Sequence, residues 1–149
     1  MKSRFSFLTI LCMVLILPSW TVSAKEVIRV GTLAPKGSSW HRILSQMGAE
    51  IMKNTKGDVE LRIYAGGIVG DESEMIRKMR IGQLHAAAIS NAGIAGNDPS
   101  AYALNLPLKF NSYQEWDYVR NRINPDLETK IREKGFEVLT WSDVGWVYF

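Results

Sequence analysis

Three segments with strand character are separated by two segments with helical periodicity, and this order constrains the fold more than any other feature. The strand-like segments are residues 27–33, 59–64 and 84–89, and the helical ones begin after Ser38 and Asp71. Crossovers of this length join parallel strands, and nearly all such connections are right-handed. The sequence therefore predicts an α/β fold with a mostly parallel sheet flanked by helices.

The first turns of both helices carry recognisable signals. Ser38 and Ser39 are good N-caps, and the residues that follow them have the spacing of one helical face: Trp40, Ile43, Leu44, Met47 and Ile51. Asp71, with Glu74 three positions later, resembles a capping box, and Gly82 closes that helix.

The chain beyond the third strand is less regular. Residues 91–110 are expected to cross the surface of the domain. A second capping box, Ser112 with Glu115, predicts a helix, and Asn124-Pro125 is expected to begin another that ends at Gly135. This part of the sequence therefore predicts two consecutive helices.

A fourth strand candidate follows at residues 136–141, and the chain ends inside an apolar run at residues 146–149. An aromatic strand with an unpaired edge invites aggregation. We therefore expect that the sequence is truncated.

Residues 1–24 have the three parts of an export signal: two positive charges, an apolar block at residues 5–17 and a small-residue cleavage site. The block is shorter than the roughly 20 apolar residues that cross a bilayer. We expect cleavage after Ala24 and a periplasmic mature chain, residues 25–149, that forms one domain. The only cysteine, Cys12, lies in the signal, so the mature chain has no disulfide.

Charge and composition exclude several functions. Without Lys2 and Arg4, the 18 basic residues fall to 16 against 15 acidic ones, which gives a nucleic-acid partner no support. The mature chain has two separated histidines, His41 and His85, and none of the common hydrolase or phosphate-loop motifs. The sequence therefore disfavours an enzyme and predicts no cofactor and no metal.

Polar loops should follow the carboxyl ends of the strands, where open α/β sheets bind ligands. Glu72, Ser90 and Asn91 suit a small polar solute, and Trp40 and Trp146 suit its apolar parts. Each residue also has a structural explanation as a cap or as core. These loops, which together would line one cleft, are residues 34–40, 66–72, 90–93 and 142–146.

The glycine-rich turn at residues 66–70 precedes a helix, where backbone N–H groups can hold an anion. Asp71 already occupies the cap, however, and its carboxylate argues against a bound phosphate.

These motifs together resemble the DctP family of periplasmic solute receptors of TRAP transporters. The resemblance runs from about Val27 to Phe149. It rests on the order and spacing of three motifs: Gly70-Asp71-Glu72, Gly82-Gln83-Leu84 and Leu106-Pro107.

The resemblance implies a fold like that of periplasmic binding proteins, with this chain as the first domain of a two-domain receptor. A small carboxylate-bearing solute, such as a C4-dicarboxylate, would bind between the domains and be delivered to the permease in the membrane. In the family, an arginine of the second domain pairs with the solute carboxylate.

Individual positions also match ligand-facing places in the family. The places near Ser90, Gly93 and Val147 carry charges in some relatives but are neutral here, which leaves open a solute other than a simple dicarboxylate. The ligand-binding residues implied by the resemblance are Leu33, Glu72, Ser90, Asn91, Gly93, Trp146 and Val147.

Three other functions stay open at this point. The domain would serve equally as an exported ligand-sensing module of a signalling receptor. An exported enzyme on the same scaffold would reveal itself by turnover of an organic acid. A truncated half-receptor would bind nothing by itself.

Overall fold

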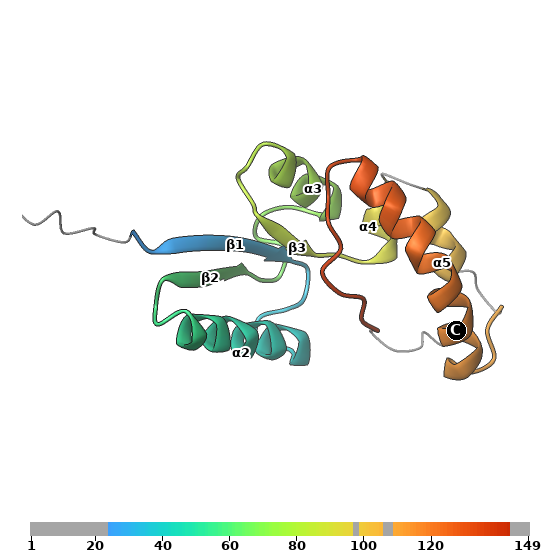
Figure 1. Cartoon of the computed structure of the whole chain (residues 1–149), viewed down its shortest axis with the longest axis horizontal. Helices are drawn as coiled ribbons and strands as arrows, with labels where there is room; N and C mark the ends of the chain where they lie inside the picture. Colours follow the sequence, from blue (N-terminus) through green and yellow to red (C-terminus); the bar gives the residue numbers. More distant parts are fainter. Residues whose placement is uncertain (1–23, 97–98, 106–108, 144–149) are drawn as a thin grey trace, which may run out of the picture.

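The computed structural model describes residues 24–96, 99–105 and 109–143 (Figure 1). The two ends of the chain, with the expected signal up to residue 23 and the run at residues 146–149, lie outside the described residues, as does Leu106-Pro107. The elements, in chain order, are β1 (Glu26–Thr32), α2 (Ser39–Asn54), β2 (Val59–Tyr64), α3 (Glu72–Arg80), β3 (Ala86–Ala88), α4 (Asn91–Ala95), the 3₁₀ helix η1 (Pro99–Asn105) and α5 (Tyr113–Glu133).

A three-stranded parallel sheet with the order β2-β1-β3 forms the centre of the first half. Glu26 pairs with Val59 at one end of the β1–β2 ladder, and Val30 pairs with Ala86 where β3 joins. α2 lies on one face of this sheet and α3 on the other (Figure 1). The predicted α/β fold and its parallel sheet are confirmed.

Helix α2 contacts the sheet through its smallest residue. A Cβ on Gly48 would lie 3.2 Å from Leu61 Cβ, so the helix backbone approaches β2 closely. Two of the apolar side chains that predicted the helix are largely exposed: Ile43 is 54% exposed and Met47 is 42% exposed.

The second half of the chain builds a separate core from α4, η1 and α5. Its buried members are Ala95, Ala101, Leu127 and Ile131. Residues 91–110 were expected to be irregular and to cross the surface, yet they contain α4 and η1, and Ala101 has no exposed surface.

The predicted break at Asn124-Pro125 is wrong, because α5 is one helix that continues through Pro125. Proline in a helix removes one backbone hydrogen bond and crowds the preceding turn. Burial of Leu127 and Ile131 against η1 and α4 offsets that cost, since both side chains lie on the packed side of the helix.

The predicted fourth strand is also absent: residues 136–141 carry no ladder hydrogen bonds and are not a strand in the described chain. Val138 and Trp141 are half-buried against the α5 core instead. The Trp141 indole N–H donates to Glu128 Oε1 at 2.6 Å. Side-chain packing on α5 therefore takes the place of pairing with β3.

Candidate functional site

The loops that follow β1 and β2 are joined by their backbones. Gly66 N–H donates to Ala34 O at 2.9 Å, and Gly67 N–H donates to Thr32 O at 3.1 Å. Both glycines have positive φ, near 70°, which permits this turn. The carboxyl ends of the two strands therefore form one continuous edge.

Glu72 and Ser90 connect the second and third loops of this edge. Ser90 N–H donates to Glu72 Oε1 at 2.6 Å, and Ser90 Oγ donates to Glu72 Oε2 at 2.8 Å. Glu72 stands in the first turn of α3 and Ser90 follows β3. Both carboxylate oxygens are thus oriented by one serine, and the contact was not foreseen although each residue was named.

Gly93 lies against the same carboxylate. A Cβ built on Gly93 would come within 2.8 Å of Glu72 Cβ and Oε2, so no side chain fits there. Ser90 Oγ also caps α4, because Gly93 N–H donates to it at 3.5 Å. Glu72, Ser90 and Gly93 form a cluster that we call the Glu72 clamp.

The other sequence-predicted residues follow β1, begin α4 or lie outside the described residues. Leu33 follows β1 and is 45% exposed, with Cδ2 3.2 Å from where a Cβ on Gly67 would be. Asn91 is the first residue of α4 and is half-buried. Trp146 and Val147 lie outside the described residues.

The N-terminus of α3 is already capped. Asp71 Oδ1 accepts from Glu74 N–H at 2.8 Å, as the sequence predicted. One turn on, Arg77 donates to both oxygens of Glu74 at 3.3 and 2.8 Å, and this hydrogen bond holds the pKa of Glu74 below its ordinary value.

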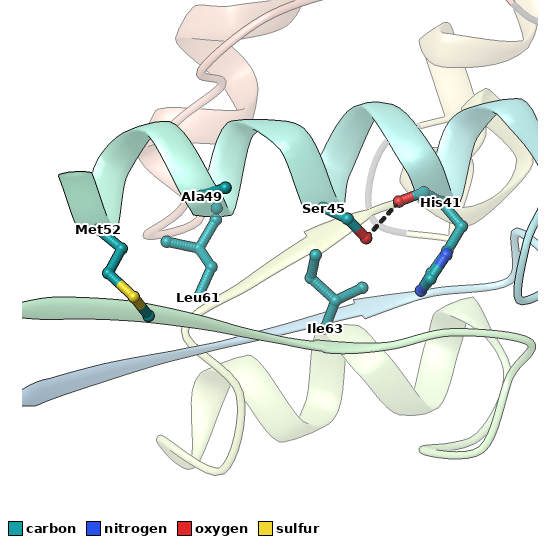
Figure 2. A pocket seen from close by; sticks show the side chains of 7 residues that line it. His41, Ser45, Ala49, Met52, Leu61 and Ile63 are labelled. Atoms are coloured by element: carbon teal, nitrogen blue, oxygen red, sulfur yellow. Dashed lines mark hydrogen bonds between the residues drawn. The ribbon is translucent and has the colours of Figure 1, made fainter. Parts of the chain in front are cut away.

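A hollow lies elsewhere, between α2 and β2 (Figure 2), and has a volume of about 380 Å³. Ser45 Oγ donates to His41 O at 2.7 Å beside it, and His41 Nδ1 accepts from Gly37 N–H at 3.3 Å. These contacts give His41 a structural role. The hollow is lined by His41, Ser45, Gly48, Ala49, Met52, Leu61 and Ile63.

The described residues contain no group of three or more His, Cys, Asp or Glu side chains placed to hold a metal ion. None of the helices in the described part of the chain is both long and apolar enough to cross a bilayer.

The family model of the bacterial extracellular solute-binding proteins, family 7, known as DctP, matches residues 30–149. The chain belongs to this family. The predicted resemblance is thereby confirmed, and the prediction against an enzyme agrees with a family of solute-binding proteins.

A curated relative is the 2,3-diketo-L-gulonate-binding periplasmic protein of Escherichia coli. It is 23% identical over 124 residues, which cover 83% of this chain and 38% of the relative. This DctP chain therefore spans well under half the length of the curated relatives that it matches.

Solved structures of TRAP periplasmic solute-binding proteins share the fold. The Roseobacter denitrificans protein with bound L-galactonate has a TM-score of 0.66 and 22% identity, covering 74% of this chain and 37% of that one. The protein of Fusobacterium nucleatum with bound sn-glycerol-3-phosphate has a TM-score of 0.69 and 20% identity, with coverages of 77% and 38%. At these identities the likeness establishes the architecture.

Proposed function

We propose that this chain is the N-terminal domain, residues 25–149, of a periplasmic solute receptor that captures a small organic acid and delivers it to the permease of a TRAP transporter. Membership of the DctP family supports the class of function. The observation that carries the proposal is the Glu72 clamp, which lies with the joined β1 and β2 loops at the sheet edge where α/β folds bind ligands.

The residues proposed to face the solute have different parts to play. Exposed Leu33 offers an apolar wall. The Glu72 carboxylate, oriented by Ser90, accepts hydrogen bonds from solute hydroxyls, and Asn91 adds an amide at the next position along the chain. Gly93 keeps the space beside Glu72 clear of a side chain. Trp146 and Val147 would complete the wall.

Glu72 also bears on the class of solute. Its hydrogen-bond partners at the edge are the neutral N–H and O–H groups of Ser90, so its negative charge repels a second carboxylate placed there. We infer that a hydroxylated acid with one carboxylate, as in the galactonate bound by the R. denitrificans relative, fits better than a C4-dicarboxylate. The acid group would then face the second domain.

Calorimetric titration tests this proposal with galactonate and succinate as probes. Galactonate should bind more tightly than succinate. E72Q should reduce that preference at least about tenfold, because the neutral amide no longer repels the second carboxylate of succinate. A tenfold change in affinity corresponds to about 1.4 kcal/mol. E74Q is the matched control, since Glu74 lies two positions on but pairs with Arg77. Equal effects of the two variants would contradict the role of Glu72. Binding of neither acid would favour the half-receptor that binds nothing by itself.

Localisation has its own test. Expression of the whole chain in a bacterium with two membranes, followed by mass spectrometry of the periplasmic fraction, should give a mature protein that begins at Lys25. An intact N-terminus in the cytoplasmic fraction would refute the proposed export signal and the periplasmic site of action.

A further inference from the structure

The chain reverses direction after α5 and runs back beside it, and we call residues 136–143 the fold-back segment. Gly135, with φ of 85°, makes the turn, and Phe136 N–H donates to Ile131 O at 3.2 Å. In Figure 1 this segment descends between α5 and the end of the sheet. It is therefore held by a helix, not by a β-ladder.

Three side-chain pairs fasten the fold-back segment at successive points. Arg132 pairs with Glu137 at 2.8 Å near the turn, the Trp141 indole donates to Glu128 in the middle, and Arg120 meets Asp143 at 3.4 Å at the far end. The helix partners move from position 132 to 128 to 120, so each pair marks a further step back along α5.

Of the two arginines in these pairs, Arg120 is held more firmly than Arg132. Its Nη2 lies 2.8 Å from Asp117 Oδ1, and its guanidinium stacks over the Trp116 ring with 4.8 Å to the centroid. Its side chain is 21% exposed, against 56% for Arg132. Two residues of its own helix fix the guanidinium, so little further side-chain entropy is lost when Nη1 meets Asp143.

The geometry points to Arg120 as a positioning residue that fixes Asp143, and with it the point at which the chain leaves α5 for the loop predicted at residues 142–146. This inference rests on the proposed function in one respect: Trp146, proposed to face the solute, follows Asp143 by three positions. Arg120 itself would not touch the solute, because it acts through Asp143.

A lysine cannot replace Arg120 in this role. The guanidinium serves Asp117 with one terminal nitrogen and Asp143 with the other, whereas lysine ends in a single ammonium. R120K therefore keeps the charge and loses the simultaneous contact with both carboxylates. R120K thus separates the effect of the positive charge at position 120 from the effect of the guanidinium geometry.

Nuclear magnetic resonance relaxation of backbone ¹⁵N in the whole chain tests the inference without any solute. We expect R120Q and D143N to lower the order parameters of Ser142 and Asp143 from about 0.85 toward less than about 0.6, the values of rigid and flexible backbone. R120K should give an intermediate loss. R132Q is the matched control and should act at Glu137 while leaving residues 142–143 unchanged.

A smaller loss in R120K than in R120Q would show that the charge facing Asp143 contributes to the order, which a purely structural role of Arg120 would not produce. Unchanged order parameters at residues 142–143 in both R120Q and D143N would overturn the inference. A uniform loss across β1, β2 and β3 in both variants would also overturn it, since Arg120 would then support the whole fold. Failure of the chain to bind any acid would contradict the proposed function alone.

Discussion

Gly93 is a residue at which the structure leaves no room for a side chain. A Cβ there would lie 2.8 Å from Glu72 Oε2, so G93A should displace the carboxylate from Ser90 and lower the free energy of unfolding by about 1–3 kcal/mol. Urea denaturation measures the change. G96A is the control in the same stretch: its nearest atom lies 3.4 Å away, so it should cost less than about 0.5 kcal/mol. Equal losses would mean that the crowding is not specific to Gly93.

The side chain of His85 accepts a hydrogen bond from the backbone of β1. Arg29 N–H donates to His85 Nδ1 at 3.1 Å, just before β3 begins to pair with β1. A neutral imidazole has one acceptor nitrogen, so Nε2 carries the proton and its 3.1 Å approach to Arg29 Nη2 is not a second acceptor bond. The Arg29 guanidinium bonds Gln83 O and Gly82 O instead.

Substitution of His85 should reveal this role. H85A should lower the free energy of unfolding by about 0.5–1.5 kcal/mol, the net value of an ordinary hydrogen bond. H85N should recover most of the loss, because the asparagine Oδ1 stands where Nδ1 stood. Thermal denaturation of the three proteins provides the comparison, and identical midpoints for H85A and H85N would exclude the hydrogen bond as the cause.

At the scale of elements, α5 shows how packing overrides a local helix breaker. Because α5 continues through Pro125, P125A should add a backbone hydrogen bond within the helix and raise the free energy of unfolding by about 1–3 kcal/mol. The control is D126A at the next exposed position, which should change it by less than about 0.5 kcal/mol. A value near zero for P125A in urea denaturation would favour two separate helices.

At the scale of the whole molecule, exposed ion pairs make stability depend on pH. Hydrogen bonds from Lys25, Arg77 and Arg132 hold the pKa values of their partners below the ordinary 4.5; these partners are Glu60, Glu74 and Glu137. A lowered folded pKa means that the stabilisation is complete above about pH 4.5 and is lost as the pH falls through the folded values.

The urea concentration at the midpoint of unfolding, measured between pH 7 and pH 3, should therefore decrease as the pH falls below about 4.5. E137Q should flatten this fall, because it removes one of the three titrating carboxylates. High salt should flatten it as well, since exposed pairs are screened. A midpoint that rises on acidification would contradict the assignment of these pairs.

The sequence by itself determined the elements whose signals are local. The caps at Ser38, Asp71 and Ser112 accept hydrogen bonds three residues on, as the sequence predicted, because a cap involves only its own first turn. Strand periodicity likewise placed β1 and β2 to within one residue. The order of these elements was enough to predict the parallel α/β sheet.

Only the tertiary structure decided which faces meet and which residues lie together. The apolar stripe of α2 was visible in the sequence, yet Gly48 makes the close contact and Ile43 stays exposed. Residues 136–141 have strand character but pack on α5, since pairing with β3 requires a non-local contact that periodicity does not encode. Glu72 and Ser90 are 18 positions apart, and only the folding of α3 and β3 onto one sheet brings the carboxylate to the serine.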